Sequence, residues 1–201
     1  ESFARVAVLD LGVKKATLDN LRQRGLELVV MPSSSTAEEI RAENVDALFY
    51  SNGPGDPEAS QNQVEALQQL LKEGLPFFGI CFGNQLLGRA LGFETYKLQF
   101  GHRGINQPVF NSESGRVEVT AHNHGFAVKL EQDKAASPAG FGNVEVRHRS
   151  LNDGVVEGLK CLDIDAFSVQ YHPEAAAGPH DSHYLFDEFI EMIRSNLAKK
   201  K

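Results

Sequence analysis

A cysteine with the surroundings of a catalytic nucleophile lies near the middle of the chain. Cys81 is in the segment GICFGNQ at 79–85, where an apolar run ends and a helical pattern begins at once. A Gly-x-Cys-x-Gly turn of this kind has the form of a nucleophile elbow, in which a strained turn lifts the side chain above the sheet. The free N–H groups of the helix N-terminus, beginning with that of Phe82, are expected to lower the thiol pKa and to bind a developing oxyanion.

A histidine and a carboxylate follow the last strongly apolar strand, in the segment VQYHPEA at 169–175. Residues i and i+2 of an extended chain point to the same side, so Glu174 can reach the imidazole nitrogen of His172 that faces away from a thiol. His172 would then be the base for Cys81, and Glu174 would set its tautomer. Each signal alone has a structural alternative, since most free cysteines are buried hydrophobes and a His-Pro-Glu segment can be a capped surface histidine.

The elements that must position these residues form an α/β pattern. In the first half, strands are expected at 5–12, 26–32, 45–51 and 75–80, and helices at 14–25, 35–43, 61–74 and 83–92. In the second half, strands are expected at 94–100, 108–111, 116–122, 125–130, 143–151, 155–162 and 165–172, before a helix at 183–198. Alternating strands and helices predict right-handed crossovers and a parallel sheet. We expect one domain over 1–201 with an open mixed, mainly parallel sheet flanked by helices, and additional antiparallel strands.

Composition excludes several classes of partner. The 201 residues carry a net charge of −7, which argues against nucleic acid and against an anionic membrane surface. No apolar stretch approaches the roughly 20 residues of a membrane span, and no signal peptide opens the chain. Cys81 and Cys161 alone cannot build a disulfide framework, so a cytoplasmic location is expected. Because the chain opens on Glu1 and enters a strand pattern almost at once, we expect it to be a piece of a longer polypeptide.

GICFGNQ and VQYHPEA together resemble the class I (triad) glutamine amidotransferases, whose glutaminase domains share a Cys-His-Glu triad. Other segments narrow the resemblance to the glutaminase domain of the carbamoyl-phosphate synthetase small chain: SNGPGDP at 51–57, TYKLQFGHRGINQPV at 95–109, NHGFAV at 123–128 and GPHDS at 178–182. The resemblance covers essentially the whole chain and implies a flavodoxin-like amidotransferase fold. GHRG and NHGFAV are more specific than the triad, because related glutaminases differ there.

The resemblance implies that Cys81 attacks the side-chain amide of L-glutamine, with His172 as general base and acid and Glu174 as its orienting carboxylate. Hydrolysis through a thioester would give glutamate and ammonia. The ammonia would pass to the large synthetase subunit, which makes carbamoyl phosphate from bicarbonate and ATP for pyrimidine or arginine biosynthesis. A second oxyanion donor would be the N–H of Gly53. The residues implied to line the glutamine pocket are Gly53, Gly55, Phe82, Gln85, Asn123, Gly125 and Phe126.

The resemblance also sets expectations for cofactors and partners. It implies no cofactor in this domain, since ATP and divalent metal are used by the large subunit. The family's small chain has an N-terminal domain that nothing in this chain matches, so the expected partners are that domain and the large subunit. The run His122-Asn123-His124 suggests a metal site. We expect none, because three adjacent residues cannot all point at one ion and no carboxylate cluster supports them.

Several alternatives remain open from the residues alone. Gly53–Gly55 can be a surface turn, Gln85 a polar residue on a helix surface, and Asn123–Gly125 a tight hairpin turn. The chain departs from the family pattern at Phe82, at Gln107 and before the GPHDS segment, without losing a catalytic group. Two other functions compete: a stand-alone γ-glutamyl hydrolase or peptidase of the same fold, and a catalytically inactive regulatory domain. GHRG and NHGFAV argue against the first, and the presence of Cys81 argues against the second.

Overall fold

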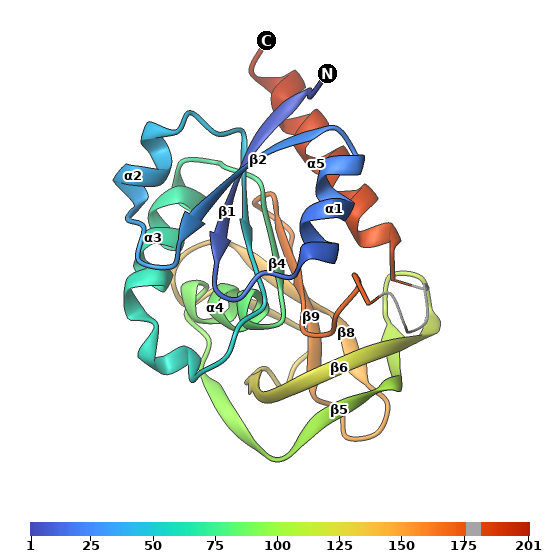
Figure 1. Ribbon diagram of the computed structural model, residues 1–201. Helices are drawn as coiled ribbons and strands as arrows, with labels where there is room; N and C mark the ends of the chain where they lie inside the picture. Colours follow the sequence, from blue (N-terminus) through green and yellow to red (C-terminus); the bar gives the residue numbers. More distant parts are fainter. Residues whose placement is uncertain (176–181) are drawn as a thin grey trace.

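One sheet of ten strands organises the part of the chain that the computed structural model describes, residues 1–175 and 182–201 (Figure 1). Its strand order is β2-β1-β3-β4-β10-β9-β8-β5-β6, with β7 beside β8. The first five strands of this order are mutually parallel, and from β10 onward neighbouring strands are antiparallel. The open mixed sheet expected from the sequence is thereby confirmed.

The strands divide between the two parts of the sheet. The parallel part contains β1 (Ala4–Asp10), β2 (Leu26–Pro32), β3 (Ala47–Tyr50), β4 (Phe77–Ile80) and β10 (Ala166–Val169). The antiparallel part contains β5 (Thr95–Asn111), β6 (Arg116–Val128), β7 (Lys134–Ala136), β8 (Asn143–Ser150) and β9 (Val156–Cys161). Two short central strands, β3 and β4, are buried along their whole length, which agrees with their continuous apolar sequences.

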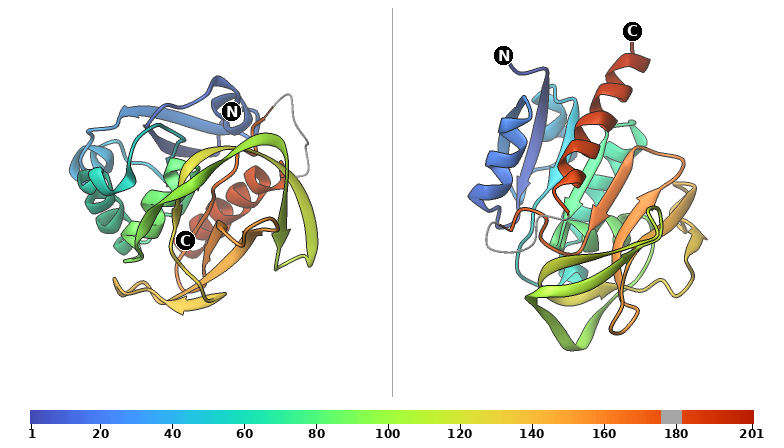
Figure 2. Two further views of the ribbon diagram at one scale, coloured as in Figure 1. Left: turned by 90° about the horizontal axis from the view of Figure 1, so that it is seen from below. Right: turned by 90° about the vertical axis from the view of Figure 1, so that its right-hand side faces the viewer.

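Helices cover both faces of the parallel part (Figures 1 and 2). One face carries α1 (Lys15–Gln23) and α5 (Tyr184–Lys199), and the other carries α2 (Ala37–Ala42), α3 (Gln61–Lys72) and α4 (Phe82–Ala90). A short 3₁₀ helix, η1 (Pro57–Ala59), precedes α3. Phe78 of β4 shows how the first face is filled: its ring stacks on Phe167 at 4.5 Å between centroids and contacts Phe186 and Phe189 of α5. Among the described residues, no helix combines the length and apolarity needed to cross a membrane.

The second half differs from its prediction in three places. The expected strands at 94–100 and 108–111 are parts of one strand, β5, and those at 116–122 and 125–130 are joined in β6. Pairing of β5 with β6 shifts register twice, between Lys97 and His102 and again between Gly104 and Gln107. These irregularities interrupt the period-2 pattern that identifies a strand. The pattern of β5 therefore predicts two short strands joined by a loop. The three-residue β7 has no counterpart among the expected strands.

The carboxyl ends of three neighbouring parallel strands meet at one edge of the sheet. Phe77 of β4 lies between Leu48 of β3 and Ala166 of β10, and all three strands run the same way. The loop after β3, the turn after β4 and the segment after β10 therefore leave the sheet side by side. Ligand sites of open α/β sheets form at this edge.

The turn after β4 depends on a close approach between α4 and β3. A Cβ atom at Gly83 would lie 2.3 Å from the carbonyl oxygen of Tyr50, and one at Gly79 would lie 2.7 Å from Gly83. Neither backbone can yield without moving a central strand, so these two positions require glycine.

Gly83→Ala should therefore destabilise the fold by about 2 kcal/mol or more, because the methyl group forces α4 away from β3. Urea unfolding followed by circular dichroism measures this. Gly125→Ala is the matched control, since a Cβ there meets nothing within 4 Å. Equal stability of the two variants would contradict the packing argument.

Candidate active site

Cys81 occupies a strained turn between β4 and α4. Its φ of 55° and ψ of −102° lie in a region that L-residues rarely adopt, and it is one of two non-glycine residues with positive φ among those described. Its own N–H donates to the carbonyl of Val169 at 2.8 Å, which ties the turn to the end of β10. Backbone strain that persists between packed elements is typical of a nucleophile elbow. The structure therefore has the local geometry expected from the GICFGNQ segment.

The charge state of the thiol differs from the expectation. The sequence predicts a lowered pKa, but burial raises the pKa of Cys81 to about 12, with a further rise from the negative charge of Glu174. The N–H of Phe82 and the amide of Gln170 favour the thiolate, but not enough to offset burial. The side chain is only 4% exposed, which explains why desolvation dominates. Because the resting thiol is protonated, it needs a nearby base before it can act as a nucleophile.

His172 and Glu174 lie together beside this turn. His172 Nδ1 is 2.8 Å from Glu174 Oε1, and both side chains are buried. A carboxylate accepts only, so Nδ1 carries the proton in this pair and Nε2 is left to accept one. Burial disfavours the charged carboxylate, yet the hydrogen bond from His172 holds the pKa of Glu174 below its ordinary value. The ammonium of Lys14, 3.5 Å from the same oxygen, adds to this effect.

A cleft of about 560 Å³ brings most of the predicted site residues together. Its lining includes Cys81 and His172 together with Gly53, Gly55, Gln85, Asn123, Gly125 and Phe126. Two predicted site residues are not part of this lining. Phe82 packs its side chain in the apolar core, so that only its backbone N–H faces the thiol, and Glu174 is buried against His172. Residues 178–181 of the GPHDS segment lie outside the described residues.

The glycine loop after β3 is shaped by the loop after β1. A Cβ at Gly53 would lie 2.0 Å from the carbonyl oxygen of Leu11, and Asn52 Nδ2 donates to the carbonyl of Gly12 at 3.1 Å. Gly55 adopts a φ of +113°, which favours glycine even though the space around it is open. The segment is therefore a supported wall of the cleft rather than a free surface turn.

Gln85 is part of a buried amide network beneath the thiol. Its Nε2 donates to the carbonyl of Phe126 at 3.1 Å and to Gln170 Oε1 at 3.2 Å, while Gln170 Nε2 lies 3.6 Å from Cys81 Sγ. Gln85 Oε1 is buried without a hydrogen-bond partner among the described residues. The alternative that Gln85 is a surface residue is wrong. An unpaired buried oxygen lining a cleft is suited to accept from a ligand's N–H groups.

Four polar contributors to this site were not expected from the sequence. Gln170 lies two residues before His172 and thus on the same side of the extended chain, a signal that the His-Pro-Glu argument could have used. Three cations also line the cleft: Lys14, Lys97 and Arg103. They come from loops and from the bulged part of β5, where sequence alone gives no orientation. Together they make the cleft suited to an anionic group.

Asn123–Gly125 do not form the hairpin turn considered as an alternative. Asn123 pairs with Arg103 inside the β5–β6 ladder, and the strand continues through Phe126. The carbonyl of Asn123 lies 3.9 Å from Cys81 Sγ. A strand of the antiparallel part therefore reaches over the elbow and closes one side of the cleft.

Comparisons with known proteins identify relatives of the chain. A model of the family "Glutamine amidotransferase class-I" matches residues 7–192. The chain is 57% identical over its whole length to a carbamoyl phosphate synthase small chain of Bifidobacterium longum, covering 50% of that protein. It is 56% identical to the small chains of Streptomyces avermitilis and Mycobacterium tuberculosis, covering 96% and 94% of this chain and 50% of each relative. The chain thus spans about half the length of the curated relatives it matches.

The fold also has a counterpart among solved structures. A Thermoplasma acidophilum protein, described as a candidate GMP synthase subunit, superposes with a TM-score of 0.79 over 100% of both chains. Its sequence is only 17% identical, so this similarity concerns the fold alone.

The pairing of thiol and imidazole can be tested by alkylation with iodoacetamide. Replacing His172 by Ala should slow labelling of Cys81 near pH 7.5 by about tenfold or more, because no base then remains to take the proton of a thiol whose pKa is raised by burial. The residual rate should continue to rise with pH into the alkaline range. Peptide mass spectrometry follows both cysteines, and buried Cys161, whose pKa is also raised to about 12, should stay unlabelled. An unchanged rate at Cys81 would mean that His172 is not its base.

Proposed function

The chain belongs to the class-I glutamine amidotransferase family, and we propose that it hydrolyses L-glutamine to glutamate and ammonia as the glutaminase half of a carbamoyl phosphate synthase small chain. One observation carries the proposal. A cysteine in a strained strand–helix turn shares a cleft with a histidine whose outer nitrogen is held by a buried carboxylate. This is the arrangement of a nucleophile, a base and an orienting group.

The mechanism follows from the protonation states in the site. His172 Nε2 takes the thiol proton of Cys81, and the thiolate attacks the side-chain amide carbon of glutamine. The N–H groups of Phe82 and Gly53 stabilise the oxyanion of the tetrahedral adduct. His172 then gives its proton to the leaving nitrogen, so that ammonia departs and a glutamyl thioester remains. Water activated by the same imidazole hydrolyses the thioester to glutamate.

The charged ends of glutamine have matching groups in the cleft. The unpaired Oε1 of Gln85 is an acceptor for the α-ammonium group, and backbone groups of Asn123, Gly125 and Phe126 surround the same region. The cations Lys97 and Arg103 are suited to the α-carboxylate. The cleft would thereby favour free glutamine over an amide that lacks the charged α-ammonium and α-carboxylate groups.

The ammonia produced is proposed to pass to the large synthetase subunit, which uses bicarbonate and ATP with divalent metal, so that this domain itself needs no cofactor. The small chains from the three relatives are about twice as long as the aligned region. The N-terminal domain of the small chain is accordingly proposed as a second partner. A cytoplasmic setting suits two free cysteines that do not pair with each other.

The two competing functions are less well supported. The relatives of the chain argue against a stand-alone γ-glutamyl hydrolase or peptidase, because proteins described as carbamoyl phosphate synthase small chains match it at 55–57% identity. The strained turn at Cys81 and the histidine–carboxylate pair beside it argue against an inactive regulatory domain, because a domain without catalytic activity would have no use for them. The three hypotheses differ in what reacts with Cys81: glutamine in the proposal, a peptide or γ-glutamyl conjugate in the hydrolase, and no substrate in the inactive domain.

The first experiment is labelling with the glutamine-analogue alkylator 6-diazo-5-oxo-norleucine, followed by mass spectrometry. One label per chain at Cys81, suppressed by glutamine, is the expected result, and Cys81→Ala should abolish both labelling and glutaminase activity while preserving the fold. Cys161→Ala is the control and should keep both, because that residue is buried in β9 away from the cleft. Glutaminase activity in Cys81→Ala, or no labelling even with the large subunit present, would overturn the proposal.

Gln85→Ala tests recognition of glutamine. Removing this side chain deletes the proposed acceptor and frees the carbonyl of Phe126, so KM for glutamine should rise about tenfold, with a smaller change in kcat. Gln69→Ala on the exposed side of α3 is the control and should leave both constants unchanged. A loss confined to kcat would assign Gln85 to the reaction rather than to binding.

A further inference from the structure

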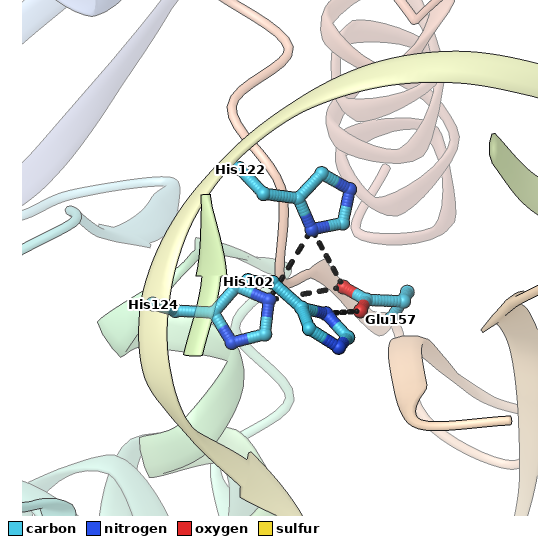
Figure 3. Close-up of side chains that lie close together, drawn as sticks. All are labelled: His102, His122, His124 and Glu157. Atoms are coloured by element: carbon cyan, nitrogen blue, oxygen red, sulfur yellow. Dashed lines mark hydrogen bonds and ion pairs between the residues drawn. The ribbon is translucent and has the colours of Figure 1, made fainter. Parts of the chain in front are cut away.

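Three histidines and a glutamate converge next to the cleft, as Figure 3 shows for their side chains. His102 comes from β5, His122 and His124 from β6, and Glu157 from β9. One ligand atom from each residue lies within 4.8 Å of those of all the others. Glu157 is 0% exposed, so its charge is removed from solvent and must be balanced by its neighbours.

The partners of the two β6 histidines fix which ring nitrogen carries hydrogen. Thr120 Oγ1 donates to the carbonyl of Gln107 at 2.9 Å, so it accepts from His122 Nε2 at 2.6 Å. The carbonyl of Phe126 can only accept, so His124 Nδ1 donates to it at 3.0 Å. With these outer nitrogens donating, His122 Nδ1 and His124 Nε2 are the ring atoms that face the centre of the cluster.

These two ring nitrogens face each other and face a carboxylate oxygen. His122 Nδ1 and His124 Nε2 are 3.3 Å apart, and Glu157 Oε2 lies 3.5 Å from the first and 3.4 Å from the second. Glu157 Oε2 has no hydrogen-bond partner among the described residues. Three potential metal-ligand atoms thus converge on one point. A cation bound among them would give all three atoms a partner at once and would add to the charge balance that His102 supplies to Glu157.

The spacing matches a metal ion better than a proton shared by one pair. In a tetrahedral zinc site with bonds of about 2.0–2.2 Å, ligand atoms are about 3.3–3.5 Å apart. The three separations in the cluster lie in this range. A proton on one histidine can serve one of these pairs at a time, whereas a metal ion can contact all three atoms.

The outer contacts of the histidines have the pattern of metal-ligand support. Each ring directs its second nitrogen to an acceptor: His102 Nε2 to Asp153 at 2.6 Å, His122 to Thr120, and His124 to the Phe126 carbonyl. Acceptors in these positions set ring orientation and make the inner nitrogen a better ligand. Three imidazoles with one carboxylate are a donor set suited to zinc.

We propose that His122 Nδ1, His124 Nε2 and Glu157 Oε2 bind one Zn²⁺ ion, with His102 Nδ1 as the fourth ligand. His102 Nδ1 now donates to Glu157 Oε1 at 2.7 Å, and it exchanges this hydrogen bond for the ion, releasing one proton on binding. This proposal departs from the sequence-based expectation of no metal site. Asn123 points elsewhere while His122 and His124 project together, and the missing carboxylate comes from a distant strand.

The ion would fasten the strand that closes the cleft. His124 is itself part of the cleft lining, and Asn123, Gly125 and Phe126 lie within two residues of it. Zinc would join β6 to β9 at this point and so hold the proposed glutamine-binding backbone in place. Its role is structural, because none of its ligands is the nucleophile or the base.

The test uses the Cys81→Ala chain, since the active-site thiol and His172 also make a candidate zinc site. Equilibrium dialysis against Zn²⁺ with elemental analysis should give one ion per chain, and thermal unfolding should show a higher Tm that EDTA reverses. Co²⁺ should give the visible absorption of a tetrahedral site without the near-ultraviolet thiolate band. In the same background, His122→Gln and Glu157→Gln should each weaken binding by more than the 10- to 100-fold typical of a lost outer contact.

Two variants serve as matched controls. His183→Gln and Glu145→Gln change the same residue types outside the cluster and should leave stoichiometry and affinity unchanged. His122→Gln keeps a donor for Thr120, so it tests the site even where Glu157→Gln impairs folding. No bound zinc in the folded parent, or binding that survives both cluster variants, would overturn the proposal. These readouts do not depend on glutaminase activity and so fail independently of the proposed function.

Discussion

The contact between Gly83 of α4 and the carbonyl of Tyr50 in β3 is the constraint on which the site depends. It brings the first turn of α4 so close to the sheet that Cys81 must turn through a positive φ to connect β4 with the helix. The same approach aims the N–H groups of the helix start at the thiol and places the glycine loop after β3 beside it. Packing of the core thus creates the strain at the elbow, and the strain is maintained because two central strands would have to move to release it.

Burial of a carboxylate costs free energy unless its charge is compensated. In two places the structure compensates a buried carboxylate with a histidine. Glu174 is held by His172 and approached by Lys14, while Glu157 is held by His102, which in turn is held by Asp153. The two systems are connected through the backbone, since Gln170 N–H donates to the Glu157 carbonyl at 2.8 Å just before the chain reaches His172. The backbone of Glu157 is therefore tied directly to the segment that leads to the proposed base.

The predictability of the fold differs between its halves for a physical reason. Parallel strands such as β3 and β4 are buried on both faces, so continuous apolar runs identify them and their ends place Cys81 and His172 at one edge. The long β5–β6 pair has register shifts and many exposed positions, and its pattern resembles a loop between short strands. Local sequence was therefore enough to propose Cys81, His172 and Glu174, whereas the proposed pocket residues came from the family resemblance. Thiol burial, Gln170 and the cations were not predicted, because they depend on contacts between distant segments.

The histidine cluster was also only partly predictable from the sequence. Two histidines separated by one residue must project together from an extended strand, which the sequence contains, but Glu157 lies far along the chain and joins them only through β9. Once β6 is known to be a strand at this point rather than a turn, the alternation of its side chains follows. His122 and His124 turn toward β9 while the backbone between them passes over the thiol. One short segment thus contributes to two neighbouring polar centres.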